Sequence, residues 1–163
     1  MNLFDSPDNL IGGASPGAGN VISGNDQTGV FLRGVSADRN LIQGNLVGTD
    51  ATGMAEIPNA TIGIVIFQGS DNVIGGVVPL ARNVVAGHTS HGIAIAGLGA
   101  DGNAIQGNYI GTDVTGTVDF GNGGDGIYIG DGSGFVPAAP GSPSHTLVGG
   151  ELPDAGNLIS GNS

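Results

Sequence analysis

The chain has 163 residues, of which 34 are glycine and none is cysteine, and its formal net charge is −11 at pH 7. Without cysteine the chain cannot form disulfides, thiolate metal sites or cysteine nucleophiles, and it contains no apolar run long enough to span a membrane. Its 14 acidic residues against 3 basic ones repel phosphate backbones, so we expect no nucleic-acid partner and consider cations and neutral partners such as sugars instead.

The N-terminal residues already belong to a repeating pattern of short apolar segments. The stretch "MNLFDSPDN" (residues 1–9) aligns with "IVIFQGSDN" (residues 64–72), which predicts that the chain opens at the first strand of a coil. The same nine residues lack the basic and apolar regions of a signal peptide, so we expect no signal peptide in this chain.

Three short patterns then recur in a fixed order. The pattern G-[VI]-x-[LI] starts at Gly29, Gly63, Gly92 and Gly126. The pattern N-x-[IV]-x-G starts at Asn9, Asn40, Asn72 and Asn103, with Thr146 at the position of a fifth Asn. The pattern N-x-[IV]-[SGA] starts at Asn20, Asn45, Asn83, Asn108 and Asn157. Successive glycines of the first pattern are 34, 29 and 34 residues apart, so two kinds of coil alternate with a combined period of 63 residues.

Segments this short cannot form a sheet within one coil, but each can pair with its equivalent in the next coil, about 4.8 Å away. We therefore predict an all-β fold, a single-stranded right-handed parallel β-helix that forms a single domain of five three-strand coils. The predicted coils are residues 1–28, 29–62, 63–91, 92–125 and 126–163, with an insertion at 134–143. Alternation sends Ile and Val side chains inward, so that, for example, Ile42 stacks on Ile74.

Asparagine recurs at two corners of every predicted coil, where its amide can bond to the coils before and after it. We expect two ladders, formed by Asn9, Asn40, Asn72 and Asn103, and by Asn20, Asn45, Asn83, Asn108 and Asn157.

The phrases "GNVISGN", "NLIQGNLVGTDATG" and "GDGIYIG" resemble the repeats of bacterial right-handed parallel β-helix proteins of the pectate-lyase-like superfold. The resemblance covers nearly the whole chain. It implies right-handed winding, which the usual crossover preference also favours, and an extracellular or cell-surface parent protein. It does not select an activity, because this scaffold carries pectin-active enzymes, alginate epimerases, phage tailspikes and adhesive arrays.

Lyases and glycosidases of this fold carry acids on one external face, so the resemblance makes Asp50 and Asp113 catalytic candidates. These equivalent residues of two "GTD" segments lie two coils apart, about 9.6 Å, close to the roughly 6.5–9.5 Å of an inverting carboxylate pair. The alternative is that each Asp bonds the backbone of its own repeated loop. Because an active site is needed only once, we favour the second interpretation, and an enzyme would be a polysaccharide lyase or glycoside hydrolase.

A second acidic column precedes the first asparagine ladder. It contains Asp8, Asp38, Asp71 and Asp101 from four successive coils. Carboxylates about 5 Å apart repel one another, so either each Asp caps its own corner or the column binds Ca²⁺, which prefers oxygen ligands. No cofactor is otherwise required.

Histidines and arginines offer few further sites. His88 and His91, in "GHTSHG", are predicted to lie in a surface turn, and His145 lies at a different corner. The motifs of pectin hydrolases and alginate epimerases are not present intact. A lyase acting on uronates needs cations, and the chain offers Arg33, Arg39 and Arg82.

The outward positions of the first strands form an apolar, partly aromatic surface. Its members are Phe31, Val65 and Tyr128 in one stripe and Phe67 in the other. This surface can dock sugar rings or a neighbouring subunit, or it is ordinary surface. We therefore expect a non-catalytic structural or adhesive module of a larger extracellular bacterial protein, with a carbohydrate-active domain as the alternative. The corresponding partners are β-helical coils stacked end to end, or a glycan.

Overall fold

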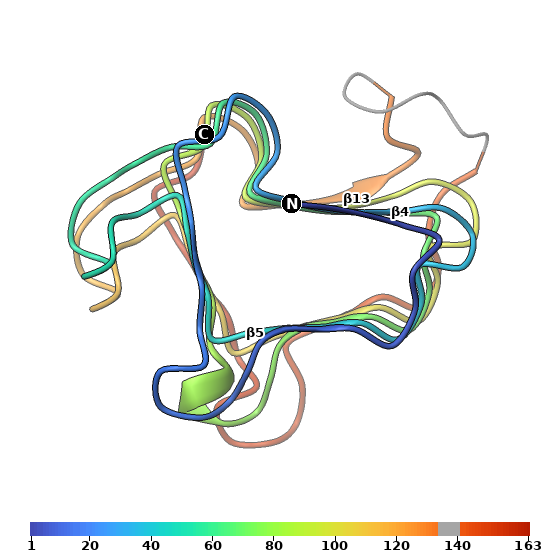
Figure 1. Cartoon of the computed structure of the whole chain (residues 1–163), viewed down its shortest axis with the longest axis horizontal. Helices are drawn as coiled ribbons and strands as arrows, with labels where there is room; N and C mark the ends of the chain where they lie inside the picture. Colours follow the sequence, from blue (N-terminus) through green and yellow to red (C-terminus); the bar gives the residue numbers. More distant parts are fainter. Residues whose placement is uncertain (134–140) are drawn as a thin grey trace.

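The structure, a computed structural model, describes residues 1–133 and 141–163, so most of the predicted insertion lies outside the described residues. The chain winds repeatedly through the same three directions, and successive coils superpose when seen along the axis (Figure 1). Every coil contributes one strand to each of three parallel sheets. This is a right-handed parallel β-helix of five coils, as predicted.

The first sheet contains β1 (Asn2–Phe4), β4 (Val30–Arg33), β7 (Ile64–Phe67), β10 (Ile93–Ala96) and β13 (Ile127–Gly130). The second contains β2 (Leu10–Gly12), β5 (Leu41–Gln43), β8 (Val73–Gly75), β11 (Ala104–Gln106) and β14 (Leu147–Val148). The third contains β3 (Val21–Ile22), β6 (Leu46–Val47), β9 (Val84–Val85), β12 (Tyr109–Ile110) and β15 (Leu158–Ile159). Equivalent strands of successive coils pair with each other, so that Ile42 of β5 lies directly beside Ile74 of β8.

The core is a column of β-branched and leucine side chains inside the tube. Successive side chains of a strand point to opposite faces of its sheet, so the alternate apolar side chains of each short segment point into this interior. Val30, Leu32, Ile42 and Ile74 have no exposed surface. At the last coil the equivalent inward residues are open to solvent, with exposed fractions of 42% for Ile129, 44% for Val148 and 46% for Ile159.

Loops of two kinds project from the tube in two rows (Figure 1). Residues 49–57 and 112–120, between the third and first sheets, belong to the second and fourth coils. The first, third and fifth coils carry a loop between the second and third sheets instead, with the shared pattern G-x-x-P-x-A-x-N at residues 13–20, 76–83 and 150–157. The middle one includes η1 (Pro79–Ala81).

This alternation explains the two coil lengths, because each kind of coil extends a different corner. Where one coil turns tightly, the neighbouring loop satisfies its backbone: the Gly44 N–H donates to the Ala81 carbonyl at 3.0 Å, and the Gly107 N–H donates to that of Ala155 at 3.0 Å. None of the helical structure in the described part of the chain has the length and hydropathy of a membrane span.

Candidate functional site

The two predicted asparagine ladders are present and include all nine predicted residues. In the first, the Asn40 side-chain amide and backbone N–H donate to Asn72 Oδ1 at 2.9 and 2.8 Å. Asn72 donates in the same way to Asn103, at 3.0 and 2.9 Å. Each rung points toward the C-terminal end, so the ladders have a direction.

A third ladder, missed in the sequence, runs along the remaining corner. Its members are Asn25, Asn59, His88, Asn122 and Asn162. The available signal was an Asn four residues before three of the four first-pattern glycines, as in "NDQTG" and "NATIG". It was hidden because the third coil has a histidine there and because long loops precede Asn59 and Asn122.

His88 therefore corrects the expectation of a surface turn. Its side chain is 1% exposed, its Nδ1 accepts the Asn59 N–H at 3.3 Å, and its own N–H donates to Asn122 Oδ1 at 3.0 Å. Burial lowers the pKa of His88 to about 4. His91 lies on the outer side of the same corner, where its Nδ1 accepts the Asp125 N–H at 3.1 Å and lies 3.3 Å from the Asp125 carboxylate. Its ring is tilted by 31° to that of Tyr128, with the centroids 5.1 Å apart.

The GTD loops hold the two catalytic candidates in matching positions. Asp50 accepts the Thr52 hydroxyl at 2.8 Å and the Met54 N–H at 3.0 Å, and these bonds lower its pKa. Asp113 is fully buried, which by itself raises its pKa, but the Val118 N–H and the Thr115 hydroxyl bond to the carboxylate and the net shift is downward. Both carboxylates accept hydrogen bonds from residues of their own loops, and these bonds hold each loop closed.

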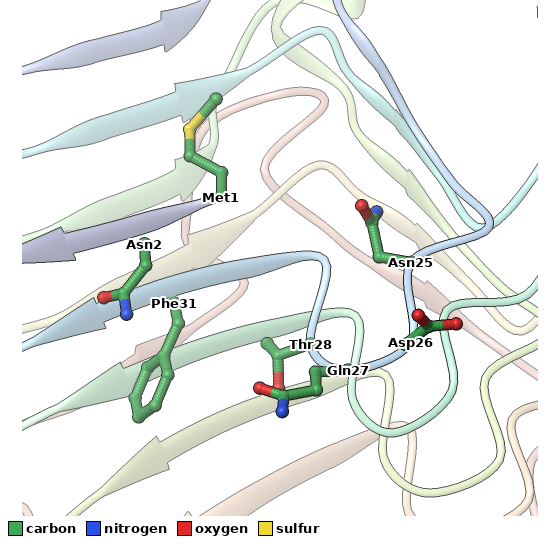
Figure 2. A pocket seen from close by; sticks show the side chains of 7 residues that line it. All are labelled: Met1, Asn2, Asn25, Asp26, Gln27, Thr28 and Phe31. Carbon is green, nitrogen blue, oxygen red and sulfur yellow. The ribbon is translucent and has the colours of Figure 1, made fainter.

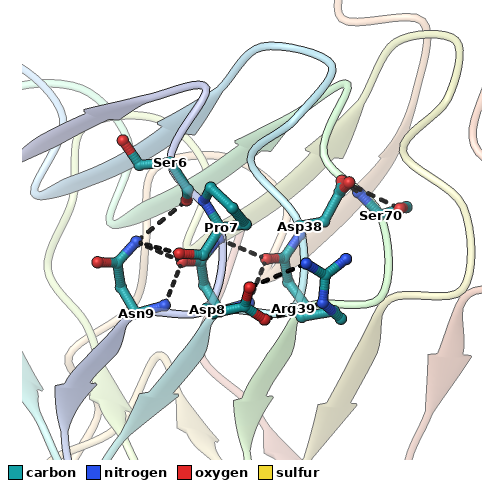
Figure 3. A network of polar contacts seen from close by, with 9 residues as sticks. Ser6, Pro7, Asp8, Asn9, Asp38, Arg39 and Ser70 are labelled. Atoms are coloured by element: carbon teal, nitrogen blue, oxygen red, sulfur yellow. Dashed lines mark hydrogen bonds and ion pairs between the residues drawn. The ribbon is translucent and has the colours of Figure 1, made fainter.

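Carboxylates of the acidic column accept hydrogen bonds from residues of the following coil, as Figure 3 shows for Asp8 and Asp38. Arg39 donates to both oxygens of Asp8 at 2.8 and 2.9 Å, and this hydrogen bond lowers the pKa of Asp8. Asp38 accepts the Ser70 N–H at 2.7 Å, and Asp101 accepts the N–H and hydroxyl of a serine in the last coil, Ser144, at 2.6 and 2.8 Å. The carboxylates of Asp8, Asp38 and Asp101 thus bond the next coil rather than their own corners. Among the described residues no cluster of three His, Asp or Glu side chains is placed to hold a metal.

The predicted outward surface is contiguous but only partly open. Val65 is 1% exposed and Phe67 is 9% exposed, and both pack in a second apolar cluster with Ala94 and other outward residues. Phe31 and Tyr128 are half-buried at its edge. Of the four predicted residues, only Phe31 and Tyr128 therefore remain accessible to a ligand.

A surface pocket of about 340 Å³ adjoins Phe31 (Figure 2). It lies between the turn at residues 25–28 and the start of the first sheet, and its lining residues are Met1, Asn2, Asn25, Asp26, Gln27, Thr28 and Phe31. The Arg33 guanidinium lies over the rings of Phe4 and Phe31, 5.2 and 5.8 Å from their centroids. One aromatic face surrounded by amides, a hydroxyl and a carboxylate suits a hydroxyl-rich ligand.

Neither a family model, nor a curated protein, nor a solved structure matches the chain. The fold and its corners nevertheless define a class: a right-handed parallel β-helix whose three corners are each tied by a ladder of buried side-chain hydrogen bonds.

Proposed function

We propose that this chain is a non-catalytic structural or adhesive β-helical module of a larger extracellular bacterial protein. The observation that carries the proposal is the continuity of the three ladders, in which hydrogen bonds between equivalent residues join each coil to the next. The acids of the GTD loops support it, because they serve loop closure. The bacterial and extracellular setting rests on the resemblance of the repeats.

The direction of the ladders also supports a proposal for the partner. In the described part of the chain, the Oδ1 atoms of Asn9, Asn20 and Asn25 receive no hydrogen bond. In the last coil the side-chain amides of Asn157 and Asn162 donate to carbonyls, but the backbone N–H groups of these two residues have no acceptor among the described residues. The last coil also exposes inward residues such as Val148. Acceptors on one face and donors with apolar side chains on the other are complementary, so the partner is another set of β-helical coils stacked in the same direction.

Sedimentation velocity of the 163-residue chain at several concentrations tests this partner. We expect the mass to rise with concentration, and Val148→Lys to prevent the rise by placing a charge in the contact. Leu41→Lys, which adds the same charge to the outer face of a middle coil, serves as the control. A strict monomer at all concentrations would overturn end-to-end stacking.

A second candidate function, glycan binding, is favoured by the pocket beside Phe31. A glycan array with the wild-type chain and Phe31→Ala tests it, with Leu41→Ala as the matched surface control. Binding that depends on Phe31 supports a carbohydrate-binding surface, and no binding to any glycan removes it. A parallel depolymerisation screen tests the non-catalytic assignment, because turnover of a uronate polymer would show a lyase or hydrolase.

A further inference from the structure

His88 is the one member of the third ladder with a titratable side chain. The imidazole lies between the two ends of the preceding coil's long loop, beside Gly48 and Gly63. A Cβ at either glycine would stand 2.6 Å from a ring atom, so the backbone closes tightly around the imidazole. The ring has no room to turn away if its hydrogen bonds become unfavourable.

The hydrogen-bond pattern determines which form of the ring fits. The Asn59 N–H donates to Nδ1 at 3.3 Å, so Nδ1 carries no proton and the neutral ring carries its hydrogen on Nε2. Nε2 has no hydrogen-bond partner of normal geometry among the described residues, although the nearby backbone of Val47 raises the pKa of the ring. A proton added at Nδ1 therefore places two N–H donors against each other inside a closed corner.

Few charged groups surround this corner. Glu56 packs its side chain against Gly87, the residue before His88, and His91 pairs with Asp125 on the outer side. Burial is the largest influence on the pKa of His88 and lowers it, whereas hydrogen bonding to the backbone of Asn59 and Val47 raises it. No carboxylate among these influences stabilises an imidazolium at this position.

We propose that His88 is a proton-sensitive joint, at which protonation detaches residues 48–63 from the third coil while the two asparagine ladders hold the tube together. A histidine exposed by opening titrates near 6.5, whereas the closed ring titrates at about 4. The closed form is consequently favoured fully above pH 6.5 and loses this advantage as the pH falls toward 4. Because the Val114 N–H bonds to the Gly53 carbonyl at 3.0 Å, opening also loosens the contact between the two GTD loops.

Hydrogen exchange at pH 7.5 and 4.5, expressed as protection factors relative to unstructured peptides at each pH, tests the proposal. We expect protection of residues 48–63 to fall about 10- to 100-fold at the lower pH, while protection of β5 changes little. His88→Asn, which places the residue found at Asn59 and Asn122, should abolish this fall, and His91→Asn should retain it. A uniform loss over all coils, or an unchanged loss in His88→Asn, would contradict the proposal.

The ring nitrogen resonances of wild-type His88 provide a second measurement that needs no variant. We expect a neutral ring protonated on Nε2 throughout pH 7.5 to 5, with uptake of a proton at lower pH together with exchange broadening of residues 48–63. A ring that titrates near 6.5 without effect on these residues would overturn the joint.

Discussion

Single ladder residues each satisfy several buried backbone groups. Asn83 donates to Asn108 Oδ1 through its N–H and amide, donates to the Ile42 carbonyl at 2.8 Å, and accepts two hydrogen bonds from Asn45. A buried polar group left without a partner costs about 1–3 kcal/mol. The stability lost when a ladder residue is replaced therefore depends on how many buried partners lose their hydrogen bonds.

We expect Asn83→Ala to lower the free energy of unfolding by about 3 kcal/mol, measured by urea denaturation. Asn20, at the exposed end of the same ladder, only donates to Asn45, so Asn20→Ala should cost less than half as much. Equal losses at the two positions would show that the ladder contributes through local turn conformation rather than through its buried hydrogen bonds.

At the scale of the elements, the two GTD loops contact each other directly, although a coil without such a loop lies between them in the chain. Gly53 has a φ of +70°, and a Cβ on it would lie 2.6 Å from the Cβ of Val114. Gly17, in a loop of the other row, has a φ of +78° and open space around the same position. The pair separates the effect of backbone conformation from that of loop packing.

Gly17→Ala should cost about 1 kcal/mol, because its backbone is left-handed, and Gly53→Ala should cost about 1–3 kcal/mol more because the loops must move apart. Thermal unfolding compares the two, and exchange protection of Val114 locates the effect. If both substitutions cost the same, the loops do not stabilise each other.

The acidic corner is an element in which three of the four carboxylates bond to residues of the following coil. Asp8 has Arg39, and Asp38 and Asp101 have serines of the following coil. We therefore expect millimolar Ca²⁺ to leave the melting temperature unchanged, with Mg²⁺ as the control. A rise specific to Ca²⁺ would favour the calcium hypothesis and direct attention to Asp71, the remaining member of the column.

At the scale of the whole molecule, each coil packs on its neighbours alone, so stability is close to a sum of coils and interfaces. A central core residue has neighbours on both sides, whereas one in the last coil has a neighbour on one side. Ile74 is fully buried, and Ile159, which is also an inward isoleucine, is 46% exposed.

Ile74→Ala is expected to cost about 2–5 kcal/mol, and Ile159→Ala under about 1 kcal/mol, when both are measured by chemical denaturation at low protein concentration. A large loss for Ile159→Ala under these conditions would mean that the last coil has a partner even in dilute solution.

The winding, the stacking of Ile42 on Ile74 and two of the three ladders could be predicted from the sequence because they depend on residues repeated at nearly constant spacing. A repeat of alternating apolar segments has one way to bury them all, and equivalent residues then become neighbours. The same reasoning placed Asp50 and Asp113 at matching positions in two loops.

The tertiary structure decided what breaks the repeat. His88 is buried because the backbone of the neighbouring coil closes over it, and no local pattern in "GHTSHG" reports that closure. Asp8 and Arg39 are 31 residues apart and meet through the pitch of the coils. Periodicity determines which residues share a column, but burial and charge pairing depend on loops and side chains that differ from coil to coil.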